Sequence, residues 1–297
     1  MTWLLGIDAG GSNCRARLTD AAGNNIGQGR AGAANAAIGI DALRAVLADA
    51  IGQATASIPR DRRRDVRIGM GIAGITRPGI RDALAASDFG FGPVVLATDA
   101  QIAHLGAHGG GDGAILILGT GSAALLRIDG QKSTIGGYGF PASDEGGGAA
   151  LGLAAVRHAL RTLDGRVPRT TFSEAVTARF DHDPARAVAW LARATPRDYA
   201  ALAPLILDHA NADDPTARAI VEDAARDIER VVDTMFARGV GRCTLVGGLA
   251  PHLQPWLGDN IVARLSPPLG DPLDGALLLA EKGAGSSSEN CRFTGAR

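Results

Sequence analysis

Cysteine is scarce in this chain and arranged without pattern. Cys14, Cys243 and Cys291 are the three cysteines among 297 residues, and they lie far apart in the sequence. An odd number of scattered cysteines argues against a disulfide framework and favours a reducing compartment, so we expect a cytoplasmic protein. His104 and His108 share i,i+4 spacing, but no third ligand is near them. We therefore expect a surface or capping role for this pair rather than a zinc site.

The sequence also lacks an excess of charge of one sign. Lys and Arg number 30 and Asp and Glu number 31, which gives a net charge of -1. Nucleic-acid binding proteins usually carry a basic excess, so we expect no nucleic-acid partner. The arginine run over residues 60–67 is interrupted by Asp61 and Asp65. This interruption favours a solvated turn before a strand over a phosphate-binding patch.

Long apolar runs are missing as well. No stretch approaches the roughly 20 apolar residues of a membrane span, and the N-terminal apolar stretch lacks the flanks of a signal peptide. We therefore expect no membrane partner. Aromatic residues make up only 4% of the chain, whereas glycine occurs 41 times. This composition favours tight turns and close backbone approaches over aromatic recognition surfaces, so the glycine-rich segments are the places to look for function.

What is present is an α/β pattern long enough for two domains. In the first block we expect strands at 3–8, 14–20, 25–30, 67–73 and 94–98 and a helix at 40–57. After a hinge at 109–111, we expect strands at 114–118, 123–128 and 243–246, and helices at 145–163, within 170–209, at 217–238 and at 273–282. The predicted division is an N-terminal domain of residues 1–108 with the returning helix 271–282, a C-terminal domain of residues 109–270, and a flexible tail of residues 283–297.

Two glycine turns, each between two predicted strands, are candidate phosphate loops. The first follows Asp8 and consists of Gly10, Gly11, Ser12 and Asn13; the second is Gly119, Thr120, Gly121 and Ser122. Such turns expose backbone N–H groups that can hold phosphate oxygens, although each turn alone could be an ordinary hairpin. A carboxylate such as that of Asp8 could bind Mg²⁺ together with the oxygens of a phosphate held by the loop. The strand that follows the first loop excludes a Rossmann fingerprint, and no Walker A motif is present.

Three further segments are candidate ligand-binding segments. Asp99 follows a predicted strand and opens a helix, so it is either a general base or an ordinary helix N-cap. The loop 136–148 holds many glycines and the adjacent carboxylates Asp144 and Glu145. Gly247 and Gly248 end a buried strand, where glycine lets an adenine ring approach the backbone.

In this order, over residues 3–282, the blocks resemble the N-acetylglucosamine kinase family, within the BadF/BadG/BcrA/BcrD-type ATPases of the actin, heat-shock-chaperone and sugar-kinase superfamily. The resemblance implies an α/β protein of two ribonuclease-H-like (actin-like ATPase) domains with mixed sheets flanked by helices. Nucleotide and sugar are then expected in the cleft between the domains. ATP and Mg²⁺ are the implied cofactors, an amino sugar is the implied substrate, and a homodimer is compatible with this reading.

The resemblance also implies site residues, position by position. It implies that Asp8 binds the metal ion and that Asp99 is the catalytic base. ATP would be held by the two phosphate loops, by Gly247 and Gly248, and by Ala210, whose helix matches more loosely. The sugar would contact Asn35, Asp99, Gly137, Tyr138, Gly139 and Asp144. Two positions depart from many family members, which have threonine in place of Ser12 and tryptophan in place of Tyr138.

The predicted function is therefore transfer of the γ-phosphate of ATP to a hydroxyl of N-acetylglucosamine or glucosamine, with Asp99 as general base. N-acetylmuramic acid or another hexose is an alternative substrate. An ATPase that activates a reductase would need an iron–sulfur cluster held by cysteines, and a sensor without catalysis would be expected to lack Asp8 or Asp99. The related repressor and sugar-kinase family with a zinc site is disfavoured, because this chain has no cysteine cluster.

Overall fold

The computed structural model describes residues 2–282 and divides the chain into two compact units. Unit 1 holds the chain up to Gly111 and from Pro268 onward, and unit 2 spans Asp112–Pro267. The predicted tail of residues 283–297, with Cys291, lies outside the described residues. Each unit has its own sheet and its own hydrophobic core.

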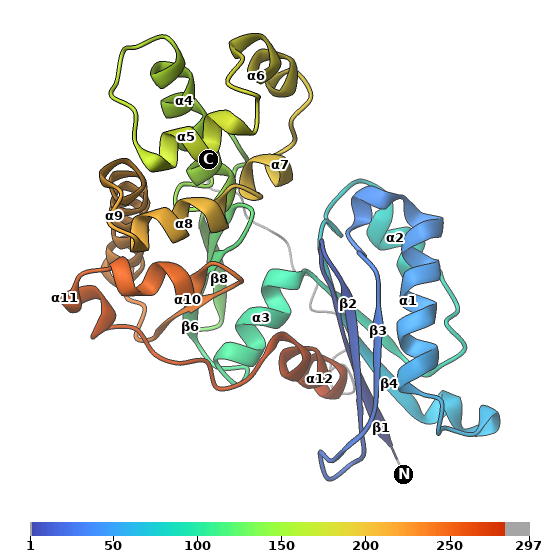
Figure 1. Cartoon of the computed structure of the whole chain (residues 1–297). Helices are drawn as coiled ribbons and strands as arrows, with labels where there is room; N and C mark the ends of the chain where they lie inside the picture. Colours follow the sequence, from blue (N-terminus) through green and yellow to red (C-terminus); the bar gives the residue numbers. More distant parts are fainter. Residues whose placement is uncertain (1, 283–297) are drawn as a thin grey trace. The chain divides into compact units, whose positions relative to one another are not determined.

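Unit 1 is built on a five-stranded mixed sheet (Figure 1). Its strands are β1 (Trp3–Ala9), β2 (Cys14–Thr19), β3 (Asn25–Ala31), β4 (Val66–Ile72) and β5 (Val94–Ala97), in the order β3-β2-β1-β4-β5. The first three strands are antiparallel neighbours, whereas β4 and β5 run parallel to β1. The strands predicted from the sequence are confirmed. In β2, Cys14, Ala16 and Leu18 are buried and the intervening arginines are not, as expected for period-2 alternation.

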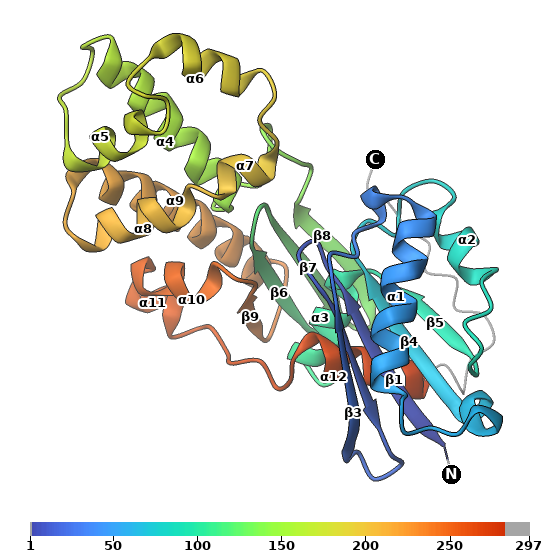
Figure 2. The same cartoon turned by 45° about the vertical axis from the view of Figure 1, so that its right-hand side comes forward.

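Helices cover both faces of this sheet (Figures 1 and 2). On one face lie α1 (Ile40–Ala54) and α2 (Ile80–Ala85), and on the other α3 (Asp99–Ala107) and α12 (Pro272–Lys282). The short turn η1 (Ala36–Ile38) precedes α1, and η2 (Arg60–Asp65) connects α1 to β4. Leu and Ile side chains fill the α1 face. On the α12 face, a Cβ on Gly69 would lie 2.1 Å from the carbonyl oxygen of Ala276. Glycine is therefore needed for α12 to contact the strands directly.

Unit 2 repeats the strand order of unit 1. Its strands are β6 (Gly113–Leu118), β7 (Ser122–Ile128), β8 (Gln131–Gly136) and β9 (Cys243–Val246), in the order β8-β7-β6-β9. As in unit 1, the first three are antiparallel and the fourth is parallel to the first. A parallel bridge between Cys243 and Leu265 stands where a fifth strand would follow. The sequence pattern does not indicate β8, because four of its six residues are exposed and no apolar alternation marks them.

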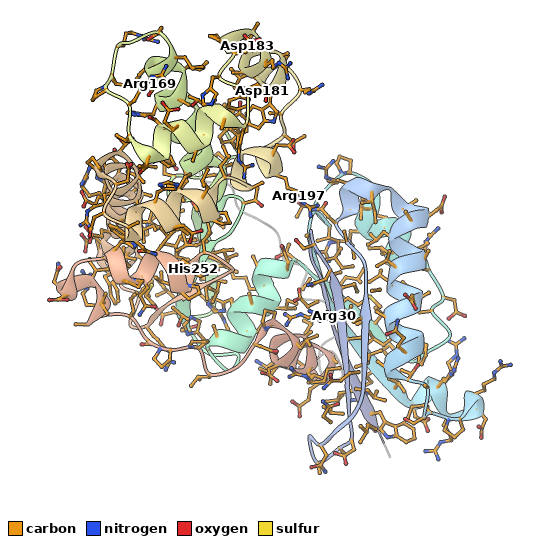
Figure 3. All side chains as sticks on the ribbon, viewed as in Figure 1. Arg30, Arg169, Asp181, Asp183, Arg197 and His252 are labelled. Atoms are coloured by element: carbon orange, nitrogen blue, oxygen red, sulfur yellow. The ribbon has the colours of Figure 1, made fainter. Side chains whose placement is uncertain are left out.

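The remaining part of unit 2 is helical. Its helices are α4 (Gly148–Leu163), α5 (Thr171–Ala178), α6 (Pro184–Leu191), α7 (Pro196–Ala200), α8 (Ala203–Asn211), α9 (Pro215–Ala237), α10 (Ala250–Leu253) and α11 (Asp259–Val262), with the turn η3 (Gln254–Trp256). The helical region predicted over 170–209 consists of four short helices, three of them with proline in the first turn. Asp183 caps α6 by accepting from the N–H of Ala185, and Asp181 pairs with Arg186 nearby (Figure 3).

Of two expectations about polar residues, the one for the histidine pair changes in the structure. His104 and His108 are not on the surface: they are 3% and 5% exposed, and their rings lie 4.8 Å apart between centroids. The α3 face that packs against α12 carries Ile102 and Gly106, whereas His104 and His108 lie together on another face of the helix, with His108 at the C-cap position. The other expectation is confirmed: the arginine run forms the turn η2 directly before β4, and all residues of η2 except the partly exposed Arg63 are exposed.

Candidate functional site

In unit 1, the predicted site residues lie at the carboxyl ends of the parallel strands. Asp8 stands near the end of β1, in register with Gly71 of β4. Because side chains alternate along a strand, Asp8 points to the same face as Gly6, the face covered by α12 and α3. Arg15 on the adjacent strand donates from Nη2 to Asp8 Oδ2 at 2.6 Å. The other carboxylate oxygen makes no hydrogen bond with residues 2–282.

Asp99 stands on the first turn of α3, directly after β5, but it is not the helix cap. Thr98 is the N-cap: its hydroxyl accepts from the N–H of Gln101 at 3.1 Å, and the Gln101 side chain accepts from the N–H of Thr98 at 2.9 Å. The motif Thr98-X-X-Gln101 is a capping box, a signal that the sequence already contained. The capping explanation of Asp99 is therefore wrong, and its carboxylate is available for chemistry.

The electrostatic surroundings of Asp99 favour proton acceptance. Burial raises the pKa of the Asp99 carboxyl above its usual value, and the negative charge of Asp8 adds to the increase. Backbone N–H groups at the start of α3, those of Ala100 and of Asp99 itself, oppose it. A carboxylate whose pKa is raised toward neutral pH is a stronger base than an exposed one.

The first candidate phosphate loop adjoins these carboxylates. The N–H of Gly10 donates to the carbonyl of Asn13 at 2.9 Å, which closes the turn and leaves Gly11 and Ser12 exposed. The segment containing Asn35 is tied to the ends of two strands. Its neighbours donate to backbone carbonyls on either side: Ala34 N–H to Gly10 O, and Ala36 N–H to Ala73 O, both at 2.9 Å. The structure thus places Asn35, as well as Asp8 and Asp99, at this edge of the sheet.

Arg77 is a polar residue of this edge that the sequence pattern does not single out. It belongs to the loop between β4 and α2, where Gly74 has a φ of 76°. A Cβ on Gly74 would lie 3.1 Å from Asn35 Oδ1 and 3.5 Å from Arg77 Nε. The guanidinium therefore lies near the Asn35 side chain, and no carboxylate of residues 2–282 forms an ion pair with it. No local motif could have revealed this, because Asn35 and Arg77 are 42 positions apart.

In unit 2, the second candidate phosphate loop is held by the start of α4. Gly148 and Ala149 donate their N–H groups to the carbonyls of Gly119 and Thr120, both at 2.8 Å. The Ser122 hydroxyl donates to the carbonyl of Glu145 at 2.6 Å. These bonds fix the loop 119–122 against the glycine-rich segment before α4.

The Gly247–Gly248 turn lies beside the same loop. Leu249 donates its N–H to the carbonyl of Leu118 at 3.0 Å, and a Cβ on Gly247 would lie 2.3 Å from that carbonyl oxygen. Gly247 also has a φ of 101°, which a residue with a side chain rarely adopts. Both glycines are exposed, so their backbone is accessible to a ligand. The predicted adenosine motif and the second phosphate loop are thus neighbours.

Asp144 connects the predicted sugar loop to the second phosphate loop. A Cβ on Gly121 would lie 2.3 Å from Asp144 Oδ2, so the carboxylate rests directly against the glycine backbone. Burial raises the pKa of Asp144; the N–H groups of Gly139 and Phe140, which donate to it, lower it, and Glu145 raises it further. By accepting these two hydrogen bonds, the Asp144 carboxylate holds the backbone of the loop of residues 137–141.

The remaining sugar-loop residues differ in exposure. Tyr138 is 87% exposed, whereas Phe140 packs against Tyr199 with 5.0 Å between ring centroids. Tyr199 in turn contacts Trp190, so an aromatic cluster anchors the loop to the helices. Ala210 has no exposed surface and packs in the core of unit 2. This burial gives no support to the nucleotide contact expected of Ala210, which stays a prediction.

Residues 5–280 match the BadF/BadG/BcrA/BcrD ATPase family. The chain belongs to this family. It is 37% identical over 285 residues to glucosamine kinase GspK of Vibrio cholerae, which covers 95% of this chain and 97% of the relative.

Two solved structures support the fold. A candidate N-acetylglucosamine kinase of Chromobacterium violaceum is 33% identical and superposes with a TM-score of 0.87, over 94% of this chain and 99% of that one. A ROK family glucokinase of Streptomyces griseus, solved with glucose and AMPPNP, has a TM-score of 0.54 at 18% identity, over 94% of this chain and 98% of that one. The predicted family and the predicted two-domain ribonuclease-H-like fold are confirmed.

The part of the chain that the structure describes has neither a clustered metal site nor a membrane-spanning helix. Residues 2–282 contain no group of three or more His, Cys, Asp or Glu side chains placed to hold a metal ion. Cys14 and Cys243 are fully buried, and burial raises the pKa of each thiol to about 12. Among the same residues, no helix is long and apolar enough to span a bilayer.

Proposed function

We propose that this protein transfers the γ-phosphoryl group of ATP to a hydroxyl of glucosamine or N-acetylglucosamine. The prediction that the chain is an enzyme, a sugar kinase, is confirmed by its 37% identity to a glucosamine kinase over nearly the whole of both chains. Use of ATP follows from the ATPase family. The observation that carries the mechanism is that Asp8 and Asp99 lie at the carboxyl ends of the parallel strands β1 and β5, on either side of β4, while Thr98 caps α3 in place of Asp99.

In the proposed reaction, Asp99 accepts the proton of the attacking sugar hydroxyl. Its raised pKa and its freedom from capping suit a general base, which contributes about 10²–10⁴-fold to the rate. Phosphoryl transfer otherwise depends on positioning and on compensating charge. Backbone N–H groups of residues 10–13 and 119–122 are the proposed phosphate contacts, and Gly247 and Gly248 the proposed adenosine contacts.

The residues present also fit a magnesium ion. Asp8 offers a carboxylate oxygen that is not used within residues 2–282, and Mg²⁺ binds through one or two carboxylates together with phosphates and water. Bound there with ATP, Mg²⁺ would neutralise charge on the phosphates. Arg15, which donates to the second oxygen of Asp8, would hold the carboxylate in place.

The sugar is proposed to bind at Asn35, Asp99 and the loop containing Gly137, Tyr138, Gly139 and Asp144. Asn35 and Asp99 share the carboxyl edge of the unit 1 sheet, and Asp144 shapes the loop in unit 2. N-acetylmuramic acid or another hexose is the second candidate substrate. Arg77 favours a sugar with a neutral or acidic substituent beside Asn35, because a cationic ammonium would be repelled there.

A coupled assay of ADP release tests the proposal with glucosamine, N-acetylglucosamine, N-acetylmuramic acid and glucose. We expect an amino sugar to give the highest kcat/KM, and Mg²⁺ and ATP to be required. ADP release that is unchanged by every sugar would contradict the proposed function. An ATPase that activates a reductase would instead show the broad visible absorption of an iron–sulfur cluster after anaerobic purification.

A further inference from the structure

A cavity of about 350 Å³ in unit 1 is not used by the proposed reaction. It lies between α1, which contributes Arg44, Ile51 and Gly52, and the loop of residues 87–92, which contributes Phe89 and Phe91; Arg63 of η2 completes its wall. Its volume falls within the range of roughly 300–1,000 Å³ found for small-molecule sites. All of its lining residues belong to unit 1.

Arg63 is the unusual residue of this wall. Its guanidinium carbon lies 5.5 Å from the centroid of the Phe91 ring, a cation–π arrangement that fixes its orientation. Its Nε is shielded from solvent and has no hydrogen-bond partner among residues 2–282. A cation that has lost part of its hydration without gaining a protein partner interacts more strongly with an incoming anion than an exposed arginine does.

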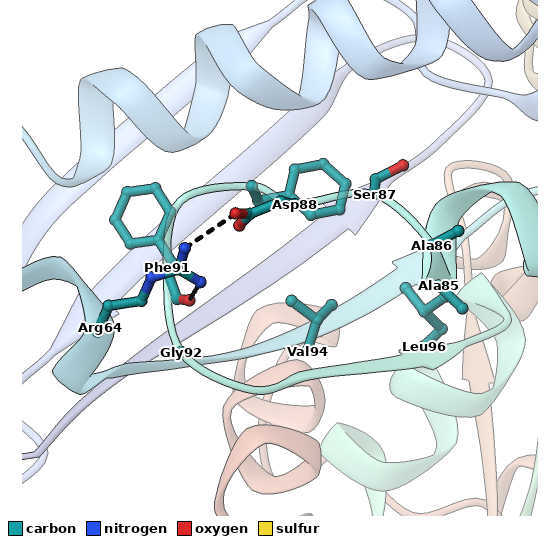
Figure 4. Close-up of a pocket in the computed structure, with 10 residues that line it drawn as sticks. Arg64, Ala85, Ala86, Ser87, Asp88, Phe91, Gly92, Val94 and Leu96 are labelled. Carbon is teal, nitrogen blue, oxygen red and sulfur yellow. Dashed lines mark hydrogen bonds and ion pairs between the residues drawn. The ribbon is translucent and has the colours of Figure 1, made fainter.

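The neighbouring arginines of the run differ from Arg63, because each is paired. Arg62 donates from Nε to Asp65 at 2.6 Å, and Arg64 donates from Nη2 to Asp88 at 2.9 Å and from Nη1 to the Phe91 carbonyl at 2.8 Å (Figure 4). Of the four arginines of η2, Arg62 and Arg64 therefore stabilise local structure, whereas Arg60 and Arg63 have no acidic partner among residues 2–282, and Arg63 is the one that lines the cavity.

The charge balance of the cavity is positive. Asp88 is the acid in its lining, and the hydrogen bond from Arg64 holds the pKa of Asp88 below its usual value, with a further bond from the Gly90 N–H. The charge of Asp88 is thus already compensated from outside the cavity. Arg44 donates to Ser87 Oγ and Ala83 O, and its ion-pair partner Asp41 is 3.6 Å away and exposed.

We propose that this cavity binds a small anion, a carboxylate or a phosphate monoester, carried on an apolar ring. The anion would accept from the guanidinium of Arg63, and the ring would lie against Phe89, Phe91 and Ile51. Gly52 borders open space, since a Cβ placed on it would meet no atom within 4 Å. The site is independent of the proposed kinase reaction and is built from other residues.

Isothermal titration with phenyl phosphate and with benzoate tests the proposal and distinguishes the two anion sources. Phenol, which has the ring without the charge, and inorganic phosphate, which has the charge without the ring, are the matched probes. We expect at least one of the two ring anions to bind tenfold or more tightly than either matched probe. Binding no tighter than that of phenol or inorganic phosphate would overturn the proposal.

Three variants locate the binding. Arg63→Met keeps the apolar stem but removes the charge and should weaken ring-anion binding at least tenfold, whereas Arg62→Met on the same turn should leave it unchanged. Gly52→Leu fills the cavity from a helical position and should abolish binding while circular dichroism shows the fold intact. Because phosphate could also bind at the glycine loops, ring-anion binding that persists in both Arg63→Met and Gly52→Leu would place the site elsewhere and refute the proposal.

Discussion

Replacing Asp99 with Asn separates its chemistry from its contribution to the fold. Asn has nearly the same size, and the α3 cap remains because Thr98 and Gln101 form it. The folded protein holds the Asp99 carboxylate where burial and Asp8 disfavour its charge. Removing that charge at neutral pH therefore relieves an unfavourable interaction, and we expect the Tm of Asp99→Asn to equal or exceed that of the wild type.

The same substitution should greatly reduce catalysis. Loss of a general base lowers the rate by about 10²–10⁴-fold, which corresponds to roughly 3–5 kcal/mol of transition-state stabilisation. The assay is ADP release at saturating ATP and sugar. Asp41→Asn is the control, because Asp41 also stands in the first turn of a helix but its side chain is 94% exposed. A kcat for Asp99→Asn within threefold of wild type would refute the role of Asp99 as base.

The pH dependence of stability gives an independent check on Asp99. Because its pKa is higher in the folded protein than in the unfolded chain, the protonated form folds more favourably. The stabilisation is complete below the unfolded pKa and is lost as the pH rises through the folded pKa. The stability of Asp99→Asn relative to wild type should therefore increase as the pH rises from about 4 toward neutrality. Denaturant titrations that show a constant difference would contradict the raised pKa.

Three further predictions follow from the site. Asp8→Asn should raise the Mg²⁺ concentration needed for half-maximal activity as well as lower kcat, and an unchanged Mg²⁺ titration would exclude Asp8 as a ligand. Arg77→Gln should raise the kcat/KM ratio of glucosamine to N-acetylglucosamine about threefold, the effect of a unit charge roughly 6 Å away in water, while Arg77→Lys should leave it unchanged. Gly121→Ala should lower stability by about 1–3 kcal/mol, because its Cβ would overlap Asp144, whereas Gly119→Ala has free space and should unfold at the wild-type temperature.

The sequence by itself determined the elements whose signal is local. The alternation in β2, the apolar stripe of α9 and the two strand, glycine turn, strand openings all appear in the structure as expected. These patterns can be interpreted from the sequence because they depend on residues a few positions apart and not on contacts between distant segments. The order of the glycine motifs was likewise sufficient to indicate the family that residues 5–280 match.

The tertiary structure decided the features that depend on which distant segments meet. Residues 131–136 form the strand β8 because they pair with β7, although most of their side chains are exposed. Ile102 of α3 packs against Ala276 because α12 returns to α3 after more than 160 residues. Arg77 came to lie beside Asn35, and Arg63 against Phe91, for the same reason. Burial and charge pairing are properties of the packed molecule, so the local sequence around each of these residues could not specify them.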